Sequence, residues 1–306
     1  MKATAISLIC ASLIAGINLS AGAAEQPTRR QLIQAIDQQL ASDDPAVFRQ
    51  GIAAIDAALA TDKFMAQEGL NSAWLKRLAS LNRHEEVADL AQRGFLVWPV
   101  NDFTIMPLLR YRIRALIALG RTQEALADAR SGFNVASMQR TSEAMALVWE
   151  CLVAAHPNDR ELLLRFREEQ WRGIESLGHR AIEPLGAAPQ SFDVPMTQSP
   201  DPPSQIENRK SKIENVMLSI RIDPAPYDRA LLDFRESGEE LNCRANLLLM
   251  AGRIDEAREL FERQYQAAPA ARLAGPTENL ARCMKAEDGN VARANRFISS
   301  VRPKDR

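Results

Sequence analysis

The feature that most constrains this chain is a six-residue segment that recurs three times. Residues 82–87 (NRHEEV) align with residues 120–125 (GRTQEA) and with residues 252–257 (GRIDEA). Each copy begins with Asn or Gly, which tolerate the left-handed conformation that ends a helix. Each continues with an acidic residue, which is favoured near the start of the next helix. The recurrence predicts a fold built from helical hairpins.

The similarity extends beyond the turns themselves. A small residue and a phenylalanine follow two of the turns at the same distance, as Gly94-Phe95 and Gly132-Phe133. A fainter copy surrounds Gly289, with Ala294 as its small residue. The spacing is 38 residues from Asn82 to Gly120 and 37 residues from Gly252 to Gly289. The residues expected in the repeat turns are Asn82, Gly120, Gly252 and Gly289.

Helical periodicity covers residues 28–172 and residues 225–301. Two further hairpins fit the same spacing without the recurring segment. Residues 28–60 turn at 43–45, and residues 142–172 turn at 156–159. Strand-like alternation is limited to residues 216–222. The sequence therefore predicts an all-α protein.

Two of the turns resemble the tetratricopeptide repeat family. The resemblance rests on Leu119-Gly120-Arg121 with Glu124-Ala125, and on Ala251-Gly252-Arg253 with Glu256-Ala257, Phe261 and Pro269. The family's Trp-x-x-Leu-Gly pattern is absent, and the repeat is longer than the usual length of about 34 residues. The resemblance implies a solenoid of stacked helical hairpins. A different solenoid of helical pairs fits the same pattern.

A proline-rich segment divides the helical regions. Six prolines lie between positions 184 and 203, which is incompatible with a regular helix. We therefore expect an irregular linker between two helical-repeat blocks. The expected organisation is a signal peptide at 1–24, an N-terminal block at 25–178, the linker at 179–222 and a C-terminal block at 223–306.

The first 24 residues differ from the rest. Lys2 is followed by an uncharged apolar run at 3–17 and by small residues at 21–24. This order is typical of a secretory signal peptide. The alternative, an N-terminal membrane anchor, needs about 20 apolar residues, and the run is shorter. We expect export to the periplasm or to the outside of the cell.

Charge and composition narrow the partners. The formal net charge is −1, whereas nucleic-acid binding requires a clear basic surplus. No later segment is long and apolar enough to span a bilayer. The sequence thus predicts neither nucleic-acid binding nor stable membrane insertion of the mature chain.

No catalytic or metal-binding pattern is recognisable. His84, His156 and His179 do not have metal-ligand spacing, and the glycines form no phosphate-binding loop. Adjacent glutamates such as Glu85-Glu86 point about 100° apart on a helix and do not converge. We expect no catalytic residue, no metal and no cofactor. A disulfide between Cys243 and Cys283, which are 40 residues apart, stays open.

The resemblance also implies a ligand groove along the first helices of the hairpins. Arg110 and Arg114 are one helical turn apart and could share a carboxylate or an acidic peptide. A solvated basic stripe without a ligand is the alternative. The residues carried over to this groove are Lys76, Arg110, Arg114, Ile117, Asn246 and Leu249.

These patterns together indicate an exported scaffold or adaptor that binds a protein or peptide and catalyses nothing. One alternative is an all-α enzyme acting on cell-envelope polysaccharide through paired carboxylates drawn from distant residues. Another is a helical accessory segment that stabilises a complex and has no ligand groove.

Overall fold

The computed structural model describes residues 27–97, 100–175, 216–237, 241–269 and 272–301. Within these ranges the protein is all-helical and contains no strand, which confirms the predicted fold class. No helix in the same ranges has both the length and the apolarity needed to cross a bilayer. The expected signal peptide and most of the expected linker lie outside the described residues.

The described residues of the N-terminal part form eleven helical segments, which include one π-helical turn and one 3-10 turn. The helices at 29–61 and 141–175 correspond to the two hairpins expected without the recurring segment. The segments are α2 (Arg29–Leu40), α3 (Pro45–Thr61), α4 (Lys63–Gly69), η1 (Leu70–Trp74), α5 (Leu75–Ser80), α6 (His84–Phe95), α7 (Asp102–Ala118), α8 (Thr122–Val135), η2 (Met138–Arg140), α9 (Thr141–Ala155) and, completing the last hairpin, α10 (Arg160–Glu175).

The C-terminal part begins at residue 216. The strand-like alternation at 216–222 is a four-residue helix followed by an irregular segment, and Val216 and Met217 are buried because they pack on the core. The helices here are α12 (Val216–Ser219), α13 (Ala225–Ser237), α14 (Leu241–Met250), α15 (Ile254–Ala267), α16 (Ala274–Asp288) and α17 (Val291–Val301).

The four repeat-turn residues adopt the left-handed conformation. Their φ angles are 56° at Asn82, 73° at Gly120, 76° at Gly252 and 69° at Gly289, and these are the only positive φ angles in the described residues. Three of the turns share a Schellman motif, in which the amide after the left-handed residue returns to a carbonyl five residues back. These bonds are Arg83 to Leu78 at 2.9 Å, Arg121 to Leu116 at 2.8 Å and Arg253 to Leu248 at 2.9 Å.

The same turns share an ion pair. The Arg that follows the left-handed residue pairs with the Glu three positions later, at 2.7 Å for Arg121–Glu124 and 2.6 Å for Arg253–Glu256. Arg121 also contacts Glu85 of the preceding hairpin at 3.1 Å. The recurring Arg-x-x-Glu therefore connects the turn to its own helix and, at Gly120, to its neighbour.

Gly120 and Gly275 provide a matched pair of substitutions. A Cβ atom added at either glycine would have no neighbouring heavy atom within 4 Å, but only Gly120 has a positive φ. We expect Gly120→Ala to lower the free energy of unfolding by about 1–2 kcal/mol, because an L residue is strained there. Gly275→Ala, in helical backbone, is expected to be neutral or to stabilise by up to about 1 kcal/mol. Chemical denaturation measures both, and an equal effect of the two changes would contradict this account of the turn.

Small residues bring neighbouring helices close together. A Cβ on Gly94 would lie 2.6 Å from Leu70 Cδ1, and one on Gly132 would lie 3.0 Å from Leu109 Cδ1. The phenylalanines that follow these glycines, Phe95 and Phe133, are buried. The shared Gly-Phe pair therefore marks a close helix contact in both hairpins.

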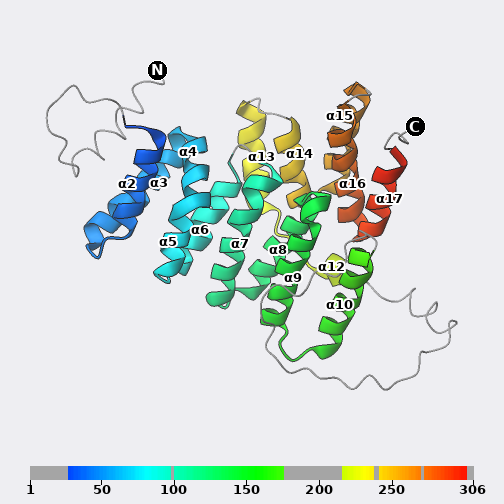
Figure 1. The fold of residues 1–306 in the computed structure, drawn as a ribbon, viewed down its shortest axis with the longest axis horizontal. Coiled ribbons are helices and arrows are strands. Elements are labelled where there is room, and N and C mark those ends of the chain that lie inside the picture. The colour runs from blue at the N-terminus through cyan, green and yellow to red at the C-terminus, as the bar shows by residue number, and fades with distance from the viewer. Residues whose placement is uncertain (1–26, 98–99, 176–215, 238–240, 270–271, 302–306) are drawn as a thin grey trace.

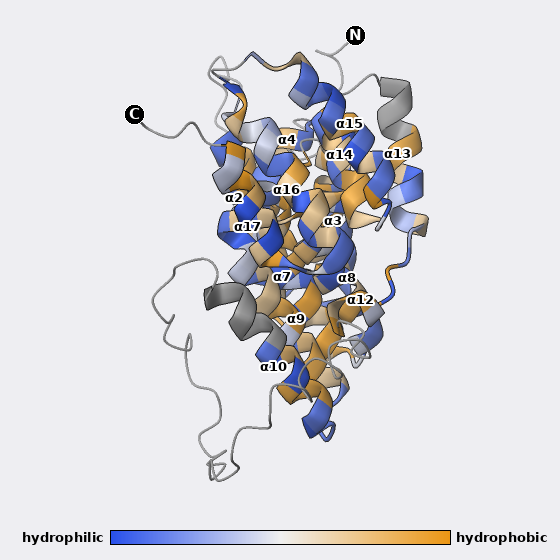
Figure 2. Ribbon diagram, turned by 90° about the vertical axis from the view of Figure 1, so that its right-hand side faces the viewer, coloured by the Kyte–Doolittle hydropathy of each residue, from blue (hydrophilic) through white to orange (hydrophobic). Residues whose placement is uncertain are grey.

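Helices adjacent in the chain pack on one another, from α2 and α3 at one end of the molecule to α16 and α17 at the other (Figure 1). Hydrophobic and hydrophilic residues alternate along these helices, as they do in helices that bury one face against their neighbours (Figure 2). Helix α8 makes the largest contacts between the two expected blocks, because it packs on α14 and α16 as well as on α7 and α9. Smaller contacts of α10 with α12 and α17, and of η2 with α16, also join the two blocks.

Candidate functional site

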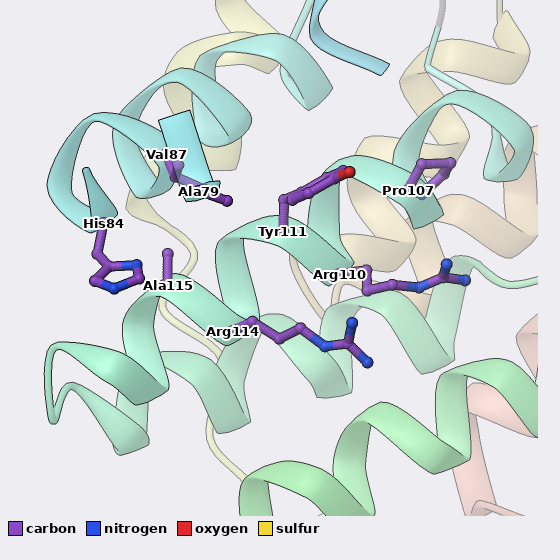
Figure 3. Close-up of a pocket in the computed structure, with 8 residues that line it drawn as sticks. All are labelled: Ala79, His84, Val87, Pro107, Arg110, Tyr111, Arg114 and Ala115. Carbon is purple, nitrogen blue, oxygen red and sulfur yellow. The ribbon is translucent and has the colours of Figure 1, made fainter. Parts of the chain in front are cut away.

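A cavity of about 320 Å³ opens between α5, α6 and α7 (Figure 3). We call it the α7 groove, because α7 supplies most of its lining. Its residues combine small apolar side chains with one aromatic ring and three basic side chains. They are Ala79, His84, Val87, Pro107, Arg110, Tyr111, Arg114 and Ala115.

Helical geometry aligns the apolar part of the α7 groove. Phe103, Pro107 and Tyr111 recur every four residues and so lie on one face of α7. Pro107 lies inside the helix and has no N–H to donate to the Phe103 carbonyl. Phe103 is 66% exposed, the highest value among the large hydrophobic side chains described. An apolar stripe therefore extends from the first turn of α7 into the groove.

The two arginines of the groove bond to α9. Arg110 pairs with Glu143, and Arg114 Nε lies 3.1 Å from Glu150 Oε1. Figure 3 shows both side chains extending away from Val87 and toward α9. Each arginine thus has its own glutamate partner, and the two do not share one carboxylate within the described residues. Exposed pairs of this kind contribute at most about 1 kcal/mol.

The other residues that were expected in the ligand groove do not line the α7 groove. Lys76 is exposed on α5, and Ile117 is half-buried near the end of α7. Asn246 and Leu249 are buried in α14, where Asn246 Nδ2 donates to the Val100 carbonyl at 2.6 Å. Because these two residues are buried, the expectation that the groove continues into the C-terminal block is wrong. Helix α14 packs against the N-terminal part instead of presenting an open face.

A second, smaller cavity of about 120 Å³ lies where α8 meets the start of α13, and we call it the α8 cleft. Its lining is far more polar than that of the α7 groove and includes three carboxylates from two parts of the chain. The residues are Gln92, Arg112, Arg121, Glu124, Ala127, Asp128, Ser131, Ile222, Asp223, Pro226 and Tyr227.

A buried ion pair forms the base of the α8 cleft. Arg112 Nε donates to Asp128 Oδ2 at 2.6 Å, and Arg112 Nη1 donates to the Ala88 carbonyl at 2.6 Å. Burial raises the pKa of Asp128 to about 6, although Arg112 opposes the shift. Burial also raises the pKa of the Tyr227 phenol. This cluster was not predicted from the sequence, although an Arg and an Asp on the inward faces of two adjacent helices were its signal.

We next consider the cysteine thiols and the possible metal ligands of the part of the chain that the structure describes. Cys151, Cys243 and Cys283 are buried there, and none of them forms a disulfide. Burial raises the pKa of Cys283 to about 11, which disfavours the reactive thiolate. No group of three or more His, Cys, Asp or Glu side chains in these ranges is arranged to hold a metal ion.

Comparison of the chain with protein-family models, with curated proteins and with solved structures finds no match. The tetratricopeptide resemblance of the turns therefore stays a prediction. What the two cavities do has to be inferred from their own geometry.

Proposed function

We propose that this protein is a helical-repeat scaffold or adaptor that binds a protein or peptide in the α7 groove and performs no catalysis. The observation that carries the proposal is the combined apolar and basic surface of α7. There the exposed ring of Phe103 leads into a cavity bordered by Tyr111 and Arg114. Aromatic and arginine side chains dominate the binding energy of many protein interfaces.

The size of the two cavities supports the same choice. Ligand pockets usually measure about 300–1,000 Å³. The α7 groove, at about 320 Å³, reaches that range, whereas the α8 cleft, at about 120 Å³, does not. A groove that continues along an exposed stripe also suits an extended or helical peptide better than a compact small molecule.

The tetratricopeptide-like arrangement is part of this proposal. The shared Schellman turns at Asn82, Gly120 and Gly252 and the close Gly-Phe contacts support a repeated hairpin unit. Repeat proteins of this kind use extended surfaces to hold partners. The contact of α14 and α16 with α8 departs from a simple linear stack, in which each hairpin touches only its neighbours.

A double substitution tests the groove. Tyr111→Ala with Arg114→Ala removes a half-buried aromatic ring and one exposed cation from α7, and circular dichroism of the variant checks that it stays folded. We expect it to reduce the partner recovered by affinity capture at least tenfold, as loss of about 1.4 kcal/mol of binding energy requires. The measurement is quantitative mass spectrometry of proteins captured from envelope extract, followed by titration of the purified partner.

The matched control removes a tyrosine and an arginine elsewhere. Tyr265→Ala with Arg263→Ala changes the same residue types on α15, outside the groove. The control should capture the partner as the unsubstituted protein does. Equal recovery by both double variants would show that any captured protein binds at another surface.

The alternative, an enzyme acting on polysaccharide, would use the α8 cleft. The observation that favours it is the presence of Glu124, Asp128 and Asp223 around one cavity, with the pKa of Asp128 raised to about 6. Against it, Glu124 and Asp128 are bonded to Arg121 and Arg112. Release of sugars from cell-envelope polysaccharide by the purified protein, abolished by Asp223→Asn, would establish the enzyme instead.

Export belongs to the proposal too, and it rests on residues 1–24 alone. Cell fractionation with N-terminal sequencing tests it. A mature chain that begins near residue 25 is expected in the envelope or medium, and an uncleaved chain in the cytoplasm would reject it.

A further inference from the structure

The contact of α8 with α14 and α16, which we call the seam, is unusually polar. Arg130, Ser131 and Asn134 project from α8 into it, and each is at most 4% exposed. Arg282 and Lys285 project from α16 and are 6% and 0% exposed. A helix packing on the core normally presents apolar side chains, so the polar composition needs a physical account.

Reciprocal capping of helix ends explains why these side chains are there. The last carbonyls of a helix lack donors within the helix. Arg130 Nη2 donates to the Ala286 carbonyl at the end of α16, at 2.7 Å. In return, Arg282 Nη1 donates to the Val135 carbonyl at 2.8 Å, and Lys285 Nζ donates to the Ala136 carbonyl at 2.6 Å, both at the end of α8. The guanidinium groups of Arg130 and Arg282 also complement the negative ends of the helix dipoles.

Side chains of α8 cap α14 in the same way. Ser131 Oγ donates to the Met250 carbonyl at 2.8 Å, and Asn134 Nδ2 donates to the Leu249 carbonyl at 3.0 Å. Polar bonds to backbone carbonyls therefore take part in attaching the C-terminal unit, residues 216–301, to α8, and smaller contacts join the same unit to α10 and η2.

Charge at the seam is poorly compensated. Within the described ranges, Arg130, Arg282 and Lys285 make no ion pair. The negative charges that act on Lys285 are Asp102 and Glu278. Both carboxylates accept hydrogen bonds from backbone N–H groups just after α8, at Ser137 and Met138. Arg258 of α15 and Arg293 of α17 are engaged elsewhere, with Glu287.

Several buried polar atoms of the three helices that form the seam also lack hydrogen-bond partners. They belong to residues of α8, α14 and α16 and are Arg130 Nη1, Asn134 Oδ1, Asn246 Oδ1, Thr277 Oγ1 and Arg282 Nε. Each unsatisfied buried group lowers the stability of the contact by about 1–3 kcal/mol. These unsatisfied groups therefore weaken the packing of α14 and α16 on the N-terminal part.

Lys285 is the titratable group at the centre of the seam. Its Nζ atom lies 4.8 Å from the centre of the Phe133 ring and 3.3 Å from Thr141 Oγ1. Burial lowers the pKa of Lys285 well below its ordinary value, and repulsion by Arg282 and Arg130 lowers it further. Protonation of Lys285 places a third positive charge beside these two arginines.

We propose that the seam is an acid-sensitive contact, and that protonation of Lys285 releases residues 216–301 from α8 as a unit while the N-terminal helices stay folded. Release does not depend on the α7 groove, which lies on other helices. The polar face of α8 that becomes exposed carries Arg130, Ser131 and Asn134.

The sign of the pH dependence follows from the lowered pKa. Between the folded-state and unfolded-state pKa values of Lys285, the released chain holds more protons than the docked chain. The stability of the seam therefore falls as the pH is lowered through that window. The penalty is complete once the pH is below the folded-state pKa.

Two buried cysteines report the event separately. Cys243 of α14 is buried against the segment that precedes α7, where its Sγ accepts from the Val100 N–H at 3.4 Å, so release of α14 from the N-terminal part exposes it. Cys151 is buried in α9, inside the N-terminal part. The full chain is treated with dithiodipyridine, which modifies thiols in acid, between about pH 9 and about pH 5, and labelled peptides are quantified by mass spectrometry. We expect acid to accelerate the labelling of Cys243 well before that of Cys151.

Lys285→Met is the decisive variant, because it keeps an unbranched side chain and removes the titrating nitrogen. At about pH 5 it should label Cys243 at least tenfold more slowly than the unsubstituted chain, which corresponds to one pKa unit. Lys76→Met, at an exposed position on α5, is the matched control and should change nothing. If Lys285→Met does not fold, Arg282→Met replaces it. Arg282→Met removes the repulsion between Arg282 and protonated Lys285, so release of residues 216–301 should occur at lower pH.

Three outcomes would overturn the proposal. Simultaneous labelling of Cys151 and Cys243 at every pH would mean global unfolding. Labelling of Cys243 that shows no acceleration in acid relative to Cys151 would mean a stable seam. An acid response unchanged in the folded Lys285→Met or Arg282→Met variant would mean that another group controls it.

Discussion

Replacing Arg112 with methionine is expected to lower the free energy of unfolding by about 3–5 kcal/mol, because it leaves the buried Asp128 carboxylate without its partner. The guanidinium connects three helices, since it extends from α7, bonds to Asp128 on α8 and donates to the Ala88 carbonyl on α6. The side chains of both partners are at most 10% exposed, so the carboxylate left behind is poorly solvated. Urea denaturation of the purified variant measures the effect.

Two controls separate loss of a partner from loss of a side chain. Arg114→Met removes an exposed arginine two positions along the same helix and is expected to change stability by less than about 1 kcal/mol. Adding Asp128→Leu to Arg112→Met removes the uncompensated charge and should restore much of the lost stability. A double variant no more stable than Arg112→Met would show that the bond to Ala88, not the ion pair, carries the effect.

Replacing Trp74 with alanine is expected to lower the free energy of unfolding by about 3–5 kcal/mol, because it leaves a large cavity in the core. The indole is fully buried, and its Nε1 donates to the Ile33 carbonyl of α2 at 3.1 Å. It lies at the end of the π-helical turn η1, against Gly69, where a Cβ would come within 2.4 Å of the ring. Thermal unfolding followed by circular dichroism checks the prediction.

Aromatic substitutions of graded severity test the same reasoning. Trp74→Phe keeps most of the volume but loses the bond to Ile33, and it should be destabilised less than Trp74→Ala. Phe103→Ala removes an exposed ring and should leave the melting temperature nearly unchanged. A large loss of stability in Phe103→Ala, equal to that of Trp74→Ala, would mean that exposure does not decide the cost.

Features that depend on nearby residues were predictable from the sequence. The left-handed conformations of Asn82, Gly120, Gly252 and Gly289 follow from the few residues that tolerate positive φ, and the structure places all its described positive φ angles there. The helical class also followed, because periodicity reflects which side of each helix is buried. The Arg-x-x-Glu pair of the turns was visible in the recurring segment but was not recognised.

The candidate site was predictable only in part. Arg110 and Arg114 line the α7 groove, as expected, yet their partners Glu143 and Glu150 lie on the next hairpin. Asn246 and Leu249 were assigned to the groove from their place in a repeat, but they are buried. Alignment within a repeat gives the face of a helix that a residue occupies, and it does not give what packs on that face.

The recurring turn by itself determined that this chain forms helical hairpins, because the interactions that end one helix and begin the next join residues at most five positions apart. Only the tertiary structure decided how the two parts meet. The bonds across the seam join residues 115 to 156 positions apart in the chain. A cation such as Lys285 has the same local preferences whether it faces water or a helix end, so its burial is fixed by the packing of α16 on α8 and not by its neighbours in sequence.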